Sequence, residues 1–212
     1  MSPALISIQV GTPRTVQQNG EEVSTGIFKS PVSKRVRLEG FNLEGDRQAD
    51  LSVHGGRDKS VYAYPSEHYP YWHKELPGVE LPWGAFGENF TTEGLLETDV
   101  CIGDRFAIGT AEVVVTQPRI PCFKLNLKFG RDDMVKRFLA SRRTGFYLRV
   151  LQEGDVGPGD EIWCAHHDEN RVSIAEILDF YLNGSDTSEL LRRALRVEYL
   201  SEAWRKELTE LK

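Results

Sequence analysis

The sequence has little of what defines several large protein classes. It contains three cysteines and two methionines in 212 residues. Even its longest apolar runs are short, such as the one at residues 113–115. An odd number of cysteines without close pairing is untypical of a disulfide framework and fits a reducing compartment. No stretch has the length of a membrane span, and residues 1–10 lack the basic segment and cleavage site of a signal peptide. We therefore expect a cytoplasmic protein without a membrane partner.

Basic residues are also in short supply. Lys and Arg number 26 against 32 Asp and Glu, which gives a formal charge of −6 and a sequence pI of about 5.5. Proteins that coat nucleic acid are normally basic, because their affinity comes from neutralising phosphates. We expect no nucleic-acid polymer as a partner, although a local basic pocket for a small anion is compatible with this composition.

Short strands and turns occupy the chain as far as about His167. Residues 4–10 alternate apolar and polar side chains, as a half-buried strand does. Two Gly-containing dipeptides, 103–104 and 109–110, supply tight turns between later strands. This pattern favours a β-barrel or sandwich, interrupted by helices at 66–76 and 132–140. The expected strands are 4–10, 26–32, 34–38, 100–102, 105–108, 111–116, 145–151 and 161–164.

The pattern becomes helical after Val172. Residues 173–176 form a capping box, and apolar residues then recur at helical spacing as far as Asn183 and Gly184. A second helix begins near 186–189, and a third carries the stripe of Trp204. Three helices in about forty residues are too small to fold reliably alone, so we expect them to dock on the barrel or on another subunit. The sequence thus predicts a mainly β domain over 1–167 and a three-helix extension over 168–212.

The three cysteines lie in different settings. Cys101 and Cys164 fall inside expected strands, where a free cysteine packs as a small hydrophobe. Cys122 follows a strand end, in a loop stiffened by prolines. Arg119 and Lys124 on either side favour the thiolate, the form that binds metals and attacks electrophiles. A lone loop cysteine is also compatible with a purely structural role.

A glycine-rich cluster, His54-Gly55-Gly56-Arg57-Asp58-Lys59, is the second candidate. Paired glycines let backbone N–H groups converge on an anion, whereas the simpler interpretation is a turn with exposed charges. The spacing is not that of a phosphate-binding P-loop. A zinc site is not expected, because His68 and His73 are five residues apart, which places them on different helix faces, and there is no second Cys/His pair.

Further polar residues stand in loops. Lys29, Arg47 and Arg142 would ordinarily be solvated surface charges, and Asn89 would ordinarily be a turn residue in a Gly/aromatic loop. Composition and spacing by themselves predict a barrel with one unusual cysteine and several loop cations. They do not identify a reaction.

Three segments in fixed order resemble the MOSC-domain proteins, and within them the YiiM group. They are GDRQADLSVHGGRDKSVYAYPSEHYPYW, FGENFTTEGLLETDVCIGDRF and QPRIPCFKLNLKFG. The resemblance covers nearly the whole chain, including the C-terminal helices. It implies a β-rich, barrel-like fold and binding of the molybdenum cofactor, a pterin dithiolene with a phosphate. It further implies reduction of N-hydroxylated compounds, such as N-hydroxylaminopurines, with the oxygen leaving as water.

The resemblance also assigns roles to residues. Cys122 matches the cysteine whose thiolate would bind molybdenum, a soft ligand for such a metal. His54 is the expected proton donor because it titrates near neutral pH, and Asp58 is the alternative. Electrons should come from a separate flavoprotein reductase, since no nucleotide-binding fingerprint is present. The residues expected to bind the cofactor are Lys29, Arg47, His54, Gly55, Gly56, Lys59, Asn89, Arg119, Lys124 and Arg142.

Two rival interpretations use the same cysteine differently. One is a molybdenum-cofactor carrier or sulfur-transfer module with a persulfide on Cys122. The other is a thiol redox sensor, which would require a resolving cysteine nearby. If the reductase interpretation holds, His54 and Cys122 should line one concave pocket at the mouth of the barrel, within roughly 10 Å of each other. A homodimer is left open by the sequence.

Overall fold

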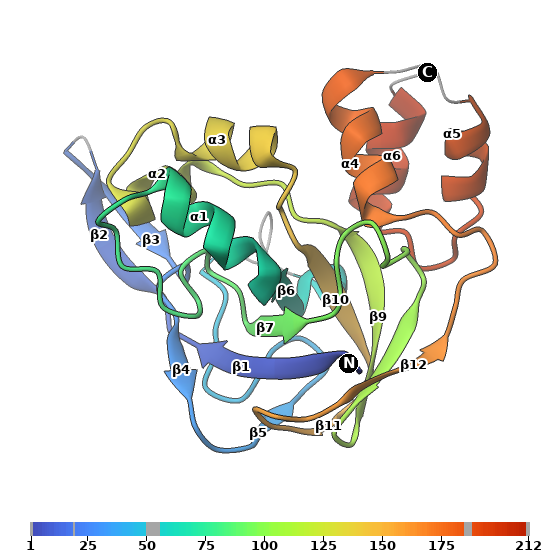
Figure 1. Cartoon of the computed structure of the whole chain (residues 1–212), viewed down its shortest axis with the longest axis horizontal. Coiled ribbons are helices and arrows are strands. Elements are labelled where there is room, and N and C mark those ends of the chain that lie inside the picture. Colours follow the sequence, from blue (N-terminus) through green and yellow to red (C-terminus); the bar gives the residue numbers. More distant parts are fainter. Residues whose placement is uncertain (1, 19, 50–55, 185–187, 211–212) are drawn as a thin grey trace.

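A curved sheet forms the centre of the molecule (Figure 1). The structure, a computed structural model, describes residues 2–18, 20–49, 56–184 and 188–210. The eight strands follow the order β12-β8-β9-β10-β6-β7-β1-β4, and β6 and β7 pair in parallel. The strands of this sheet are β1 (Ala4–Val10), β4 (Ser30–Val32), β6 (Val61–Pro65), β7 (Phe90–Glu93), β8 (Arg105–Ile108), β9 (Ala111–Pro118), β10 (Phe146–Gln152) and β12 (Ile162–His166).

The sheet closes on itself through its first and last strands. Ala4 of β1 forms a bridge with Glu161, just before β12. The backbone N–H of Leu5 donates to Asp160 O at 2.9 Å. Closure removes the unpaired edge along these residues and encloses one apolar interior. Two short ribbons extend the barrel: β2 (Arg14–Gln18) with β3 (Glu21–Thr25), and β5 (Val36–Leu38) with β11 (Gly154–Val156).

Helices cover two parts of the barrel (Figure 1). The first group packs over an aromatic cluster in which the Trp72 and Phe138 rings stack at 5.5 Å and Tyr64 lies 4.8 Å from Phe86. No helix in the described part of the chain is long and apolar enough to cross a bilayer. The helices are α1 (Tyr69–Glu75), α2 (Phe123–Phe129), α3 (Met134–Ser141), α4 (Ile174–Asn183), α5 (Ser188–Ala194) and α6 (Glu202–Glu210), with 3-10 turns at Arg57–Lys59 and Ser66–His68.

The C-terminal helices share one hydrophobic core with the barrel. Val113, Val114 and Val115 of β9 are all completely buried. Successive strand residues point to opposite faces, and β9 is covered on both sides because α4 packs against it. The backbone N–H of Ser201 donates to Thr116 O of β9 at 3.3 Å. The prediction that the helices dock on the barrel is therefore confirmed.

Local signals in the C-terminal segment are realised as predicted. The Ser173 side chain accepts from the Glu176 N–H, and the Glu176 carboxylate accepts from the Ser173 N–H, which completes the capping box. Gly184 ends α4 at a φ of 59°, in the left-handed region that favours glycine. The Trp204 side chain packs on Tyr181, with ring centroids 5.3 Å apart.

Several expected elements differ from the structure. Residues 100–102 form turns, with only an isolated bridge between Cys101 and Ser173, because Gly103 and Asp104 tighten the chain immediately afterwards. The strand expected at 26–32 is confined to Ser30–Val32. The β2–β3 ribbon, β6, β7 and α2 were not predicted. For β6 the reason is that it is buried at every position, so its sequence shows no alternation of apolar and polar residues.

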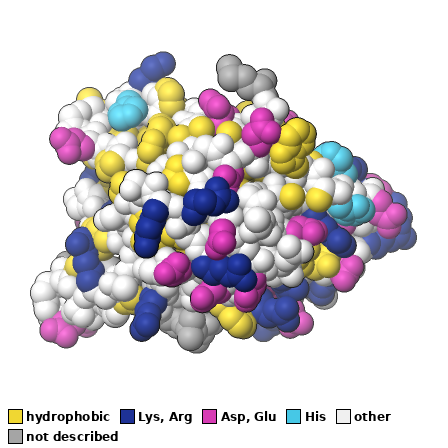
Figure 2. All heavy atoms as spheres, turned by 90° about the horizontal axis from the view of Figure 1, so that it is seen from below, with side chains coloured by type: hydrophobic (Ala, Val, Ile, Leu, Met, Phe, Trp, Pro, Cys, Tyr) yellow, Lys and Arg dark blue, Asp and Glu magenta, His cyan; other side chains and the backbone are white. Residues whose placement is uncertain are grey.

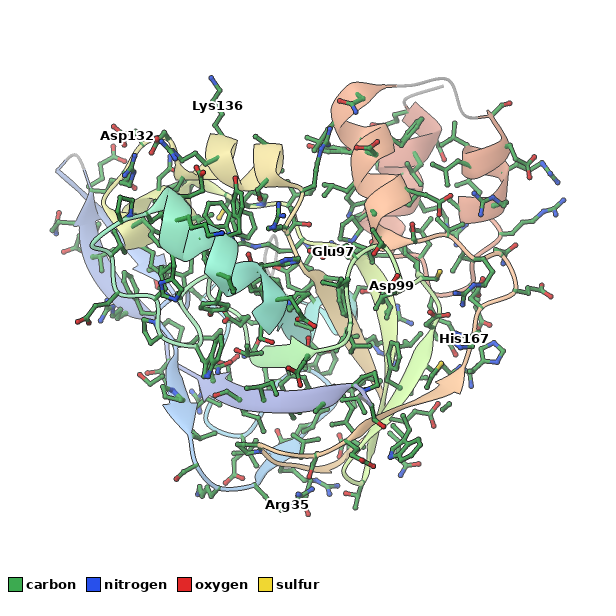
Figure 3. All side chains as sticks on the ribbon, viewed as in Figure 1. Arg35, Glu97, Asp99, Asp132, Lys136 and His167 are labelled. Carbon is green, nitrogen blue, oxygen red and sulfur yellow. The ribbon has the colours of Figure 1, made fainter. Side chains whose placement is uncertain are left out.

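Charges of both signs alternate on the face below the barrel (Figure 2). Arg35, at the lower edge in Figure 3, pairs with Asp160 at 2.6 Å. Arg37 lies 3.7 Å from Glu153. Interspersed opposite charges keep the local potential low, so this face carries no extended field of one sign.

Trp204→Ala is expected to lower the free energy of unfolding by about 3–5 kcal/mol, because it leaves a large cavity between helices and barrel. Trp204 is 5% exposed, whereas Trp163 on β12 is 60% exposed. Trp163→Ala is the matched control and should change stability by about 0.5 kcal/mol or less. Urea unfolding of both variants measures the difference. Equal losses would show that Trp204 is not the anchor of the C-terminal helices.

Candidate functional site

An open cleft lies where four loops meet around β6 and β10. It holds about 710 Å³ of empty space, which includes open solvent. Its walls come from the segment after β3, the loop after β5, the loop before β7 and the connection between β9 and α2. The polar and charged lining residues are Thr25, Lys29, Asp46, Arg47, Gln48, Lys59, Tyr62, Asn89, Arg119, Cys122, Lys124 and Tyr147.

A buried ion pair forms the base of the cleft. Lys29 Nζ lies 2.5 Å from Asp46 Oδ1, and the two side chains are 8% and 2% exposed. The Asp46 carboxylate also accepts from the Gly11 N–H at 2.9 Å and from Asn89 Nδ2 at 2.9 Å. Burial lowers the pKa of Lys29, and Asp46 opposes part of that shift. The charge of Lys29 is thus largely compensated within the protein.

Asn89 braces this base. Its Oδ1 accepts from the Tyr62 N–H at 3.2 Å, while its Nδ2 reaches Asp46 and the carbonyl of Gln9. The preceding Gly87 has a φ of 86°, and a Cβ there would lie 2.8 Å from Ile27 Cγ1. Only glycine fits this close approach without displacement. The loop therefore holds Asp46 in place. The side-chain amide of Asn89 forms its hydrogen bonds with other groups of the protein.

Lys128 of α2 fastens two cleft loops together. Its Nζ donates to Ile27 O at 3.0 Å and to Gly84 O at 2.5 Å. Burial lowers the pKa of Lys128 to about 8, although Glu88 opposes the shift. Sequence reasoning did not single out this lysine.

Arg119 is a buried cation, and no carboxylate among the described residues forms an ion pair with it. Its residue is 5% exposed, and its guanidinium carbon lies 5.0 Å from the ring centroids of Tyr62 and Phe138. Nη2 donates to Phe86 O at 3.4 Å, but buried Nη1 has no hydrogen-bond partner among the described residues. A buried charge left unpaired is costly. An anionic group in the cleft would complete this site.

Cys122 stands at the start of α2, where its carbonyl accepts from the Leu125 N–H at 2.9 Å. It is partly exposed and carries a free thiol. Its loop neighbours Ile120 and Lys124 line the cleft with it. No group of three or more His, Cys, Asp or Glu side chains suited to a metal occurs within the described ranges. Among the described residues that line the cleft, Cys122 offers a thiol that could bind a soft metal, and any further ligands would have to come from a bound group.

The structure brings most of the sequence-predicted site residues to one cleft. Seven of them line it: Lys29, Arg47, Lys59, Asn89, Arg119, Cys122 and Lys124. The Lys59 and Cys122 motifs converge although they lie far apart in the chain. His54 and Gly55 lie outside the described residues, so the expected distance from His54 to Cys122 stays a prediction.

Three predicted site residues do not line the cleft. Asp58 Oδ1 accepts from Arg149 Nε of β10 at 2.8 Å, and Gly56 begins the 3-10 turn that precedes the cleft residue Lys59. Arg142 ends α3 with a φ of 61°. Its side chain then reaches α4, with Nη2 3.2 Å from Asp179 Oδ1. Arg142 thus lies against the C-terminal helices and does not line the cleft, and its assignment to the cofactor stays a prediction.

The other two cysteines differ from each other more than the sequence indicated. Cys101 is 4% exposed, and burial raises its pKa to about 11. Cys164 is exposed, so the expectation that it packs inside the protein is wrong. Its Sγ lies 3.4 Å from Nδ1 of His167, which points outward at the edge of the molecule (Figure 3).

Sequence reasoning missed five polar lining residues, which are Thr25, Asp46, Gln48, Tyr62 and Tyr147. Asp46 stands in the quoted Gly45–Asp50 segment, where a carboxylate beside Arg47 was visible but had no assigned partner. Tyr62 and Tyr147 come from neighbouring strands, paired across β6 and β10. Gln48 donates to the Lys59 carbonyl at 2.8 Å. Only the strand pairing could have placed these tyrosines together.

Comparison with known proteins identifies related chains. A family model described as MOSC domain matches residues 50–163, and one described as YiiM-like, 3-alpha helix domain matches residues 172–211. YflK of Bacillus subtilis is 43% identical over 202 residues, which cover 95% of this chain and 91% of that protein. The crystal structure of YiiM from Geobacillus stearothermophilus has a TM-score of 0.83 at 36% identity, covering 99% of this chain and 98% of its own.

A longer relative carries a functional name. A protein of Gibberella moniliformis named "Reductase" is 36% identical over 146 residues, which cover 68% of this chain and 26% of that protein. The matched segment is therefore about a quarter of the fungal chain.

Substitution of Cys101 and of Cys164 should affect the free energy of unfolding differently. Cys101→Ala is expected to cost about 1 kcal/mol of stability, because it empties a packed position. Cys164→Ala should change stability by about 0.5 kcal/mol or less, since an exposed side chain leaves no cavity. Thermal or urea unfolding measures both. A larger loss for Cys164→Ala would contradict its assignment to the surface.

Lys128 should make stability rise with pH above about 8. Its pKa is about 8 in the folded protein, below the ordinary 10.5, so the unfolded chain binds more protons between these values. The unfolding free energy of the wild type minus that of Lys128→Met should therefore increase by at most about 1.4 kcal/mol per pH unit in this window. Urea unfolding at pH 7.5, 8.5 and 9.5 measures the increase.

Lys136→Met is the matched control, because Lys136 on α3 points into solvent (Figure 3). Its difference from the wild type should stay constant over the same pH range. A constant or falling difference for Lys128→Met would show that Lys128 is not desolvated as described.

Proposed function

The chain belongs to the MOSC-domain family, with the YiiM-like three-helix domain at its C-terminus, and on this premise we propose that it is a molybdenum-cofactor-dependent reductase of N-hydroxylated compounds. N-hydroxylaminopurines are the proposed substrate type, and their N–OH oxygen leaves as water. The observation that carries the proposal is that the thiol of Cys122 and the guanidinium of Arg119 line one cleft, and that buried Nη1 of Arg119 has no hydrogen-bond partner among the described residues. The relative named "Reductase" supports the general class of activity.

The cleft residues fit an anionic cofactor that carries a thiophilic metal. The Cys122 thiolate would hold molybdenum, since soft sulfur ligands suit soft metal sites. Arg119 would pair with an anionic group of the pterin or its phosphate, which its unpartnered Nη1 favours. Arg47, Lys59 and Lys124 add positive charge along the same walls, whereas Lys29 is already compensated by Asp46.

The chain's own residues position the cofactor and the substrate and deliver protons. When bound, the molybdenum cofactor supplies the two-electron removal of oxygen from N–OH. Proton donation is assigned to His54, as the resemblance implies. Asp58 is the weaker choice, because its carboxylate is paired with Arg149 outside the cleft. Burial raises the pKa of Tyr62, so its hydroxyl stays neutral and holds the Thr144 carbonyl at 2.8 Å.

The proposal also covers the electron donor, the cellular location and the oligomeric state. The chain carries no nucleotide-binding fingerprint, so a separate flavoprotein is the proposed electron donor. A cytoplasmic location and a homodimer are proposed with it. The rival function, a cofactor carrier or sulfur-transfer module, uses the same partly exposed thiol of Cys122 as a persulfide.

Cys122→Ser should abolish turnover of an N-hydroxylaminopurine and lower the molybdenum content, while leaving the fold intact. An alcohol oxygen is a poor ligand for a soft metal but occupies nearly the same volume. Activity with a reductant, metal analysis and far-UV circular dichroism measure the three effects. Cys164→Ala, which lies outside the cleft, is the control and should retain wild-type turnover. Full activity in Cys122→Ser would remove the thiol from the mechanism, and a labile sulfane sulfur without molybdenum would favour the carrier.

A further inference from the structure

Tyr147 is a tyrosine of the cofactor cleft that is anchored in the protein core. It stands on β10, opposite Tyr62 of β6, and the two ring centroids lie 5.5 Å apart. Both tyrosines line the cleft together with Arg119 and Cys122. Tyr147 is partly buried and packs against the aromatic cluster that α1 and α3 cover. Its ring is therefore held by the core while its residue borders the cleft.

The two cleft tyrosines differ in what their hydroxyl groups do. The Tyr62 hydroxyl donates to the Thr144 carbonyl at 2.8 Å, so its proton is committed to the backbone. The Tyr147 hydroxyl donates to no acceptor within the described ranges, and only its backbone carbonyl is engaged, by the Thr116 hydroxyl at 3.1 Å. A largely buried tyrosine hydroxyl usually finds a hydrogen-bond partner. The proton of Tyr147 is thus available to a molecule bound in the cleft.

Arg119 is the polar neighbour of the Tyr147 oxygen. Its guanidinium lies within hydrogen-bonding reach of that oxygen, and because a guanidinium only donates, the oxygen is the acceptor of this contact. Burial raises the pKa of Tyr147, and the positive charge of Arg119 opposes the rise. The phenol is therefore protonated at neutral pH, while the phenolate that proton loss would create has a cation beside it.

The charged groups around Tyr147 are mostly cations. A thiolate on Cys122 acts in the opposite direction to Arg119 and raises the pKa of Tyr147. On the other side of Tyr147, β9 places the neutral Gln117 opposite it. Among the described lining residues Asp46 is the one carboxylate, and Lys29 compensates it. The surroundings therefore favour a transient phenolate. The titratable residues that line the cleft with Tyr147 are Lys29, Asp46, Arg47, Lys59, Tyr62, Arg119, Cys122 and Lys124.

The proposed reaction consumes protons as well as electrons. Converting R–NH–OH to R–NH2 and water breaks the N–O bond and takes two electrons and two protons. The electrons come from the molybdenum cofactor, which the flavoprotein donor reduces again. One proton ends on the departing oxygen and the other on the nitrogen. His54 is assigned one proton donation, so the reaction has a place for a second donor.

We propose that Tyr147 is a catalytic acid of this site and that its hydroxyl gives a proton to the leaving oxygen of the N–OH group. The O–H bond of Tyr147 breaks and a new O–H bond forms on the substrate oxygen as the N–O bond breaks. The resulting phenolate is paired with Arg119 until water in the open cleft reprotonates it. This inference rests on the proposed function, because it assigns a further residue to the same reaction.

The first test removes the hydroxyl and keeps the ring. Turnover of an N-hydroxylaminopurine by molybdenum-loaded Tyr147→Phe should fall about 100-fold or more, as is typical for the loss of a general acid. The fall should lie in kcat more than in KM. Molybdenum content and melting temperature should equal those of the wild type, because the packed ring and the thiol of Cys122 are unchanged.

Tyr71→Phe is the matched control. Tyr71 is also partly buried against the same aromatic cluster, and the guanidinium carbon of Arg143 lies 4.2 Å from its ring centroid. It is not among the residues that line the cleft. This variant loses the same group in a similar setting and should keep wild-type turnover.

A more acidic phenol distinguishes a proton donor from a structural hydroxyl. With 3,5-difluorotyrosine in place of Tyr147, the alkaline loss of kcat should begin at lower pH than in the wild type, because the donor loses its proton earlier. The same replacement of Tyr71 should leave the pH profile unchanged. Fluorine NMR of the metal-free protein follows the ionisation at position 147 directly. Arg119→Met should move this ionisation to higher pH, since the cation that lowers the pKa is gone.

The outcomes separate this assignment from the reaction. Wild-type turnover in Tyr147→Phe, or an alkaline loss that does not move with difluorotyrosine, would overturn the assignment although the protein is a reductase. An ionisation at position 147 that Arg119→Met leaves unchanged would overturn it in the metal-free protein. A molybdenum-loaded wild type that reduces no N-hydroxylated compound would overturn the reductase proposal and this assignment with it. The two failures are distinguished because one is seen in the variants and the other in the wild type.

Discussion

The buried ion pair of Lys29 and Asp46 is the constraint on which the cleft depends. Two charges at 8% and 2% side-chain exposure are tolerable only because each is paired and hydrogen-bonded. Asp46 also holds Gly11 and Asn89, so three loops from distant parts of the sequence converge on one carboxylate. The cleft walls keep their positions, because separating Lys29 from Asp46 would leave a buried charge without a partner.

The guanidinium of Arg119, unlike Lys29, forms no ion pair with a carboxylate of the described residues. The protein neutralises Lys29 internally and leaves Arg119, equally buried, with an unsatisfied Nη1 in the described structure. The contrast supports the proposal that Arg119 pairs with an anionic ligand. An acidic chain can therefore bind an anionic cofactor, because the sign of one enclosed site is set by local compensation and not by net charge.

The sequence carried the broad architecture and part of the site. Glycine turns predicted β8 and β9, and the Ser173–Glu176 capping box predicted α4, because these signals are local. The β6 strand depends on its pairing with β10, and the contacts of Asp46 with Lys29 and Asn89 depend on loops that only tertiary structure brings together. Sequence could not place Arg142 against α4, because a cation in a loop looks the same whether its backbone turns it toward a cleft or toward a helix. The proposed chemistry of Cys122 comes from the resemblance to a family and not from spacing.

The central proposal is that the thiolate of Cys122 binds molybdenum. X-ray absorption at the molybdenum edge, on protein from a host that makes the cofactor, measures the number of sulfur ligands directly. The account predicts about one molybdenum per chain with three sulfur neighbours in the wild type, two from the dithiolene and one from Cys122. Two sulfur neighbours in the wild type, or a spectrum unchanged by Cys122→Ser, would contradict it.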